Sequence, residues 1–207
     1  MQESTSNLSE RDIQELCIGS QPIPNSGFGL LESLTLDGCH FSSDVLLSFS
    51  LLPFFTNLTT LKVQNCDSVK VIFDVKYTTQ GRDVTSMGQI LPFSLKKLII
   101  PKLPNLKNVW NEDPRRILSM YHLRAVYVED CENLTSVFPA SIAKDIAELE
   151  ELRVKNCEGL MTIVAEDNTN LNGTNQELPC SPIREVLLEG LPKLTYFYHC
   201  KGTIFHI

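Results

Sequence analysis

Apolar and polar positions follow one another along this chain in a pattern that occurs six times. The pattern is L-x-x-L-x-(L/V/I)-x-x-(C/L), in which the apolar positions are separated by three, two and three residues. Its six copies begin at Leu31, Leu58, Leu95, Leu123, Leu149 and Ile183. Six copies in the same frame indicate a repeat architecture, because chance apolar spacing does not recur in this way.

Each copy predicts one short β-strand, because the two apolar residues of L-x-L lie on the same side of a strand. The first Leu and the final Cys or Leu turn into the same interior as the chain bends at either end. One copy cannot cover its own apolar side, so neighbouring copies stack strand beside strand. The sequence therefore predicts an α/β leucine-rich repeat solenoid, a curved horseshoe arc. We expect a parallel β-sheet on its concave face, with short helices and loops on its convex face.

The repeats also define the expected domain organisation. Residues 30–200 form a leucine-rich repeat domain of about six repeats. Residues 1–29 are an N-terminal cap or a degenerate first repeat, and residues 201–207 are a truncated tail. Two stretches, 77–88 and 165–182, are polar and are expected to be mobile loops between repeats.

Two of the connections on the convex side are predicted to be helical. Residues 139–149 place Ile142, Ile146 and Leu149 on one helix face, and Ser141 is the candidate N-cap. Residues 43–52 have a similar pattern, with Ser43 or Asp44 as the candidate cap. The other connections are expected to be irregular. Six prolines are expected to fall in the connections and not in the strands: Pro53, Pro92, Pro114, Pro139, Pro179 and Pro182.

The last position of the pattern is Cys in four copies and Leu in two (Cys39, Cys66, Cys131, Cys157; Leu103, Leu191). A metal site is disfavoured, because no C-x-x-C pair exists and leucine replaces cysteine in two copies. We interpret the cysteines as small side chains packed at the end of each strand. Adjacent strands, about 4.8 Å apart, could accommodate a disulfide between neighbouring cysteines. A reducing compartment argues against it.

Composition and charge restrict the possible partners and location. The chain has 207 residues, of which 43% are hydrophobic and 21% charged, and its formal net charge is −7. An acidic chain without a basic stripe is a poor match for nucleic acid. The N-terminus lacks the apolar core of a signal peptide, and the most apolar run, 45–55, is too short to span a membrane. We expect a cytoplasmic protein that does not bind membranes.

The sequence contains none of the common catalytic or cofactor-binding motifs. G-x-x-x-x-G-K-[ST], G-x-G-x-x-G, H-E-x-x-H and G-x-S-x-G are all absent. The four histidines follow no metal-ligand spacing. We therefore expect no enzymatic activity, no cofactor and no metal site.

The residues that alternate with the strand leucines are expected to form the exposed concave surface. In the middle column, Ile99 and Tyr127 fall on adjacent strands with Lys62 and Arg153 on either side, a small apolar centre bordered by charge. This arrangement suits a protein partner, although a sheet surface also tolerates such residues without binding anything. The candidate binding residues are Lys62, Ile99, Tyr127, Arg153, Leu187, Lys97, Glu129 and Glu151.

The repeats as written here, for example "LEELRVKNCEGLMTIV" and "FPASIAKDIAELEELRVKNC", resemble those of plant intracellular immune receptors with coiled-coil and nucleotide-binding domains. That family alternates such repeats with an "LP" type, which 94–110 and 189–200 resemble. The resemblance covers about residues 30–200 and implies a plant-defence role. The partner would be a pathogen effector, a host target or a domain of the receptor itself.

The chain departs from these receptors because it has no P-loop. We therefore expect a fragment, a truncated relative or a stand-alone decoy or adaptor. The alternative is the substrate-binding repeat module of an F-box-type ubiquitin-ligase adaptor. That function requires an N-terminal helical bundle, and we expect the residues before Leu31 to be too few to form one.

Overall fold

The structure is a computed structural model that describes residues 28–75, 91–114, 118–165, 183–195 and 205–206. The predicted polar loop 77–88 lies outside the described residues. The same holds for the predicted loop 165–182, apart from Ala165.

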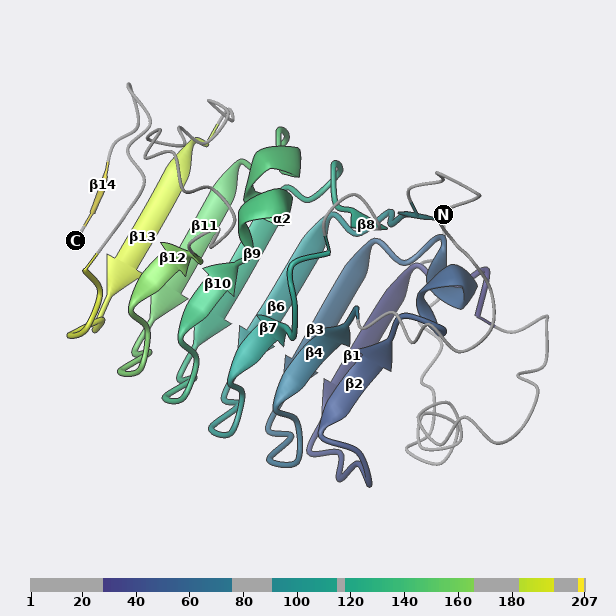
Figure 1. Cartoon of the computed structure of the whole chain (residues 1–207), viewed down its shortest axis with the longest axis horizontal. Coiled ribbons are helices and arrows are strands. Elements are labelled where there is room, and N and C mark those ends of the chain that lie inside the picture. Colours follow the sequence, from purple (N-terminus) through teal and green to yellow (C-terminus); the bar gives the residue numbers. More distant parts are fainter. Residues whose placement is uncertain (1–27, 76–90, 115–117, 166–182, 196–204, 207) are drawn as a thin grey trace.

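One seven-stranded parallel sheet runs through the molecule (Figure 1). Its strands, in spatial order, are β1 (Ser33–Asp37), β3 (Thr60–Gln64), β6 (Lys97–Pro101), β9 (Ala125–Glu129), β11 (Glu151–Lys155), β13 (Glu185–Glu189) and β14 (Phe205–His206). The first six strands are the six copies of the sequence pattern, so the predicted strands are confirmed. β14 lies within residues 201–207 and pairs with β13.

The apolar residues of each copy point into one shared core, as the pattern predicts. Leu61 and Val63 of β3 are fully buried, whereas Thr60, Lys62 and Gln64 are only partly buried. The same alternation occurs in β6, β9, β11 and β13. Interior side chains of neighbouring strands align in register and form a continuous apolar layer, whose burial stabilises each strand against the next.

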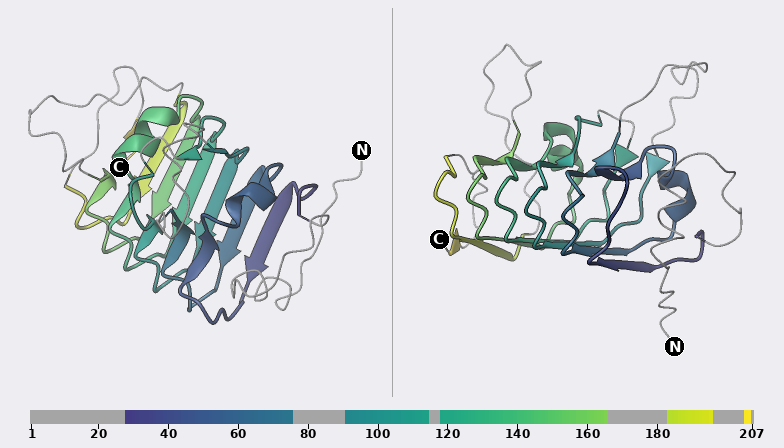
Figure 2. Two further views of the ribbon diagram at one scale, coloured as in Figure 1. Left: turned by 45° about the vertical axis from the view of Figure 1, so that its right-hand side comes forward. Right: turned by 90° about the horizontal axis from the view of Figure 1, so that it is seen from below.

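A second layer of short parallel strands faces the seven-stranded sheet across the core (Figure 2, right). Its elements are β2 (Val45–Ser48), β4 (Val71–Asp74) and β7 (Asn108–Trp110) in one sheet, β10 (Ser136–Phe138) with β12 (Thr162–Val164), and β5 (Leu91–Pro92) with β8 (Leu118–Ser119). A 3-10 helix, η1 (Leu52–Phe55), and an α-helix, α2 (Ala140–Asp145), complete the layer within the described residues. The described part of the chain is thus mostly parallel strands with few helices. The assignment of the seven-stranded sheet to a concave face and of the second layer to a convex face is still a prediction.

The helix predicted for residues 43–52 is wrong. The backbone carbonyl of Asp44 accepts hydrogen bonds from the amides of Lys70 and Val71, and β2 continues this pairing along β4. Ser43 does accept a hydrogen bond from the Val45 amide at 3.1 Å, but this cap-like contact leads into a strand. An apolar run of this length fits a buried strand as well as a helix, and here the neighbouring repeat supplies the strand partner.

The second predicted helix is confirmed, but it is shorter and capped differently. It spans Ala140–Asp145, and Ser141 lies inside it, so the predicted Ser141 cap is wrong. The Ser141 amide instead donates to Oδ2 of Asp113, at 3.2 Å, and the Ser141 hydroxyl has no partner among the described residues. An acidic side chain from the preceding repeat therefore accepts a hydrogen bond from a backbone amide at the start of this helix. A contact between repeats cannot be predicted from the local sequence pattern.

Aromatic side chains fill the second layer. The Trp110 ring lies between Phe73 and Phe138, with ring centroids 5.5 and 6.0 Å away. Since β4, β7 and β10 each contribute one ring, these contacts link three consecutive repeats. Across the described residues, no helix is long and apolar enough to cross a membrane.

Candidate functional site

A left-handed residue follows each of the first six strands of the seven-stranded sheet. The six residues are Gly38, Asn65, Lys102, Asp130, Asn156 and Gly190, with φ between 51° and 65°. Gly, Asn and Asp tolerate this conformation better than other residues, so five of the six positions suit it. The turns end all six strands at the same level. Each strand therefore presents three outward side chains in matching rows.

These outward side chains form one continuous surface, here called the sheet face. Lys62, Ile99, Tyr127, Arg153 and Leu187 are consecutive partners in the middle row. Lys97 and Glu151 lie in the first row and Glu129 in the third. The structure therefore brings all eight predicted residues onto one surface.

Tyr127 is the most constrained residue at the centre of the sheet face. Its ring has the Lys97 ammonium 4.9 Å away and the Arg153 guanidinium carbon 5.1 Å away, measured to the ring centroid. Both distances fit cation–π contacts. The Tyr127 hydroxyl donates a hydrogen bond to Oε2 of Glu151. Burial, and then the Glu151 carboxylate, raise the pKa of Tyr127, so the hydroxyl remains a donor at neutral pH.

Arg153 connects this tyrosine to the next strand. Its Nε and Nη2 donate to the two carboxylate oxygens of Glu185, at 2.9 and 3.1 Å, and Nη2 lies 3.6 Å from Glu151. The bidentate contact with Glu185 raises the pKa of Arg153. Partly exposed ion pairs add little to stability, but this network restricts the side-chain rotamers around Tyr127.

The geometry refines the predicted apolar centre. Ile99 and Tyr127 are direct neighbours across β6 and β9, as predicted. The two cations over the ring are Arg153 and Lys97, whereas the sequence placed Lys62 and Arg153 on the borders. Glu185 was not among the candidates, although its place opposite Glu151 in the register was a usable signal. The centre of the sheet face is therefore the Tyr127 ring, which is in contact with charged side chains.

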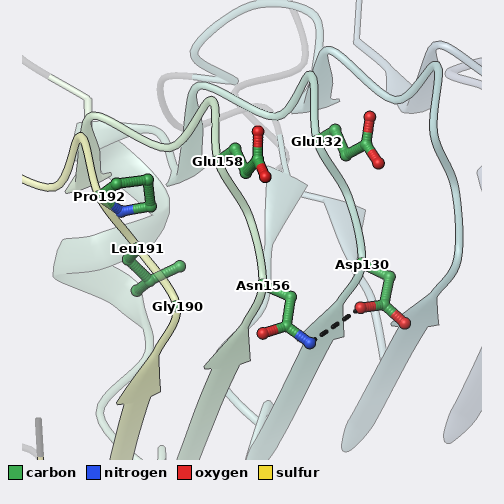
Figure 3. A pocket seen from close by; sticks show the side chains of 7 residues that line it. All are labelled: Asp130, Glu132, Asn156, Glu158, Gly190, Leu191 and Pro192. Carbon is green, nitrogen blue, oxygen red and sulfur yellow. Dashed lines mark hydrogen bonds between the residues drawn. The ribbon is translucent and has the colours of Figure 1, made fainter.

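A second feature is a hollow at the carboxyl ends of β9, β11 and β13, with a volume of about 640 Å³ (Figure 3). It is lined by Asp130, Glu132, Asn156, Glu158, Gly190, Leu191 and Pro192. Asn156 donates a hydrogen bond to Asp130 across it, at 3.0 Å. Glu132 and Glu158 occupy equivalent places on neighbouring turns. Within the described ranges, no three His, Cys, Asp or Glu residues are grouped as a metal centre.

The cysteine column lies inside the core, next to the sheet face. Cys66, Cys131 and Cys157 have no exposed surface, and Cys39 is partly exposed. All four are free thiols. The Cys66 and Cys157 thiols lie 3.1 and 3.2 Å from backbone carbonyl oxygens two residues earlier. Burial raises the pKa of Cys66 to about 11. Contact with the Cys131 thiol lowers the pKa of Cys157, but Cys157 is as inaccessible as its neighbours. The column therefore has the properties of packed side chains shielded from solvent.

Six stacked five-residue strands, each followed by a left-handed turn and a Cys or Leu, define a leucine-rich repeat protein. The chain matches the leucine-rich repeat family of plant disease resistance proteins described as RPS2-like, over residues 2–158. It belongs to this family, since the match covers about three quarters of the chain. Neither curated proteins nor solved structures gave a match.

Proposed function

We propose that the chain is a non-catalytic protein-interaction module of plant defence whose sheet face binds a protein partner. The observation that carries this proposal is the Tyr127 ring, held between Lys97 and Arg153 with its hydroxyl bound to Glu151. Family membership supports the defence role. We further propose that the repeats within 30–200 act as the binding unit, with 1–29 as a cap.

A pre-ordered tyrosine is well suited to binding. Tyrosine and arginine are enriched among the residues that dominate protein interfaces. A side chain that is already fixed in one rotamer loses less conformational entropy when a partner binds. Ile99 beside it supplies apolar area, and the charged neighbours supply a polar rim.

The finer role we propose is recognition of a pathogen effector or host target, or restraint of a receptor's nucleotide-binding domain. The printed sequence has no P-loop, so nucleotide switching would belong to another segment or another protein. We place the module in the cytoplasm on the basis of its resemblance to intracellular receptors. Its acidic charge disfavours nucleic acid as the partner. The family match supports a repeat module in plant defence, and the substrate-binding module of a ubiquitin-ligase adaptor stays the alternative.

The proposal is tested by partner binding with matched tyrosine variants. Proximity labelling in plant cells first identifies partners of the wild-type chain, and each partner is then titrated against purified protein. We expect Tyr127→Ala, alone or with Ile99→Ala, to weaken binding at least tenfold. Tyr121→Ala is the matched control, because Tyr121 is 51% exposed and precedes β9.

Circular dichroism would verify that all variants remain folded. Partners that bind the folded Tyr127→Ala/Ile99→Ala protein as tightly as the wild type would contradict the proposal. Equal losses in the Tyr121→Ala control would contradict it as well, because binding would then not depend on the sheet face.

A further inference from the structure

Two adjacent strands of the sheet face, β3 and β6, have lysines but no acidic side chains among their outward residues. The outward residues of β3 are Thr60, Lys62 and Gln64, and those of β6 are Lys97, Ile99 and Pro101. These six positions include two lysines and no acid. Among the described residues, neither lysine lies within 4.0 Å of a carboxylate oxygen.

The other end of the sheet face is different. There the cations are already paired: Arg153 binds Glu185, and the Lys155 ammonium lies 3.0 Å from Glu189. Glu151 contacts both Arg153 and the Tyr127 hydroxyl. Because these side chains already form ion pairs with one another, a charged partner would add little favourable electrostatic energy. On the described part of the sheet face, Lys62 of β3 and Lys97 of β6 are therefore the cations without a carboxylate oxygen within 4.0 Å, and Lys62 has only the longer-range attraction of Asp37 on β1, whose pKa it helps to lower.

The two lysines have a defined spacing. Lys62 pairs in register with Ile99, two residues beyond Lys97 on β6. With strands about 4.8 Å apart and a rise of about 3.3 Å per residue, their Cα atoms lie about 8 Å apart. Two side chains on the same side of an extended peptide are about 7 Å apart. An extended segment with acids two residues apart therefore matches this lysine pair.

Apolar surface lies directly beside the pair. Ile99 is partly exposed between the lysines and Tyr127, and the Lys97 ammonium is held 4.9 Å from the Tyr127 ring centroid. The contact keeps Lys97 over the ring without neutralising its charge. We call the surface formed by Lys62, Lys97, Ile99 and Tyr127 the lysine strip. It combines two cations with the apolar surface of Ile99 and the Tyr127 ring.

We propose that the lysine strip binds an acidic protein segment that also carries an apolar side chain. Two carboxylates of the segment would meet Lys62 and Lys97, and the apolar side chain would cover Ile99 and the edge of the Tyr127 ring. The inference rests on the proposed function and specifies the chemistry of its partner. The chain itself is acidic overall, with a net charge of −7. This net charge would repel an acidic segment, but physiological salt screens charges more than about 8 Å away. The nearby lysines therefore dominate the electrostatic interaction with the segment.

Three fluorescein-labelled synthetic peptides of equal length would test the inference against the full chain by fluorescence anisotropy. In the first, Asp and Glu alternate with Leu and Phe; in the second, Ser replaces Leu and Phe; in the third, Lys replaces Asp and Glu. We expect the first peptide to bind at least tenfold tighter than the other two. Raising the salt from 0.05 to about 0.5 M should weaken its binding, because ion pairs are screened.

Charge-reversal variants locate the binding. We expect Lys62→Glu/Lys97→Glu to weaken binding of the first peptide at least tenfold, and Lys62→Arg/Lys97→Arg to retain it. Lys107→Glu/Lys193→Glu is the matched control, since it makes the same charge change at exposed residues off the sheet face. It should leave binding nearly unchanged.

The inference is overturned if the first peptide fails to bind, if the Ser or Lys peptide binds equally well, or if the control variant loses as much affinity. The proposed function is judged separately. If the Lys peptide binds and Tyr127→Ala weakens it, the sheet face binds protein but not an acidic segment. If the partners found by proximity labelling are insensitive to Tyr127→Ala, the proposed function fails as well.

Discussion

Gly159 lies against the backbone of the preceding repeat, where a Cβ atom would clash with the carbonyl oxygen of Glu132. The same turn is built differently one repeat earlier. There Asn133 holds the equivalent position, and its side-chain amide donates to the carbonyl oxygen of Pro104 at 2.6 Å. Successive repeats are therefore joined at this turn either by close backbone approach or by an asparagine amide.

We expect Gly159→Ala to destabilise the protein. The added methyl group meets backbone and not a flexible side chain, so the turn itself has to shift, and such overpacking costs about 1–3 kcal/mol. The measurement is the free energy of unfolding from urea denaturation. Gly29→Ala is the control, because a Cβ at Gly29 has no atom within 4 Å. Equal stability of Gly159→Ala and wild type would show that the repeats are not in close contact here.

The sequence predicted the interior of the seven-stranded sheet well, because burial alone determines the positions of its leucines. Leu61, Leu98 and Val126 are fully buried at the places that the pattern assigns to them. The outward residues follow from the same alternation. Which outward side chains touch could not be predicted, since the contact of Arg153 with Glu185 depends on rotamers chosen among several nearby acids.

The second layer was harder to predict, because its short strands depend on neighbours distant in the sequence. β2 pairs with β4 about 26 residues later, and its apolar run does not distinguish a strand from a helix. The left-handed turns, in contrast, had a local signal. Gly, Asn or Asp precedes the final Cys or Leu in five repeats, and only Lys102 departs from it.

We expect Leu152→Ala to cost about 2–5 kcal/mol of unfolding free energy, since it removes most of a core side chain and leaves a cavity. Leu152, the second residue of β11, is 2% exposed. Lys155→Ala on the same strand is the comparison. Its partly exposed ion pair with Glu189 contributes little. Urea denaturation of both variants would test this, and similar losses in both would mean that β11 does not face the core as described.

We expect Lys102→Asn to stabilise the protein by up to about 1 kcal/mol. Lys102 has φ of 57°, a conformation that asparagine adopts at lower cost than lysine, and Asn65 and Asn156 already hold this position in other repeats. Lys107→Asn, which removes the same charge at an exposed residue without positive φ, is the control. The thermal midpoint of unfolding should rise for Lys102→Asn only. A rise of equal size in both variants would indicate a charge effect instead of relief of backbone strain.

We expect Cys66, Cys131 and Cys157 to resist alkylation in the folded protein. All three are fully buried; burial raises the pKa of Cys66 to about 11, and contact with Cys157 together with burial raises the pKa of Cys131. Few thiolates of Cys66 and Cys131 therefore form at pH 8. Contact with Cys131 lowers the pKa of Cys157, so Cys157 is protected by burial, which denies the reagent access to all three thiols. Cys39 is partly exposed and serves as the internal reference. Iodoacetamide labelling followed by peptide mass spectrometry should show Cys39 modified first.

In concentrated urea the four cysteines of the column should react at similar rates, because unfolding removes both protections. Labelling of Cys131 in the folded state as fast as Cys39 would place the column at the surface and contradict its packing role. If the intact mass of freshly purified, unreduced protein were lower by two hydrogens, a disulfide would be present. If peptide mapping then placed that bond between two cysteines of the column, the result would contradict their assignment as thiols, since neighbouring strands are close enough for the bond to form.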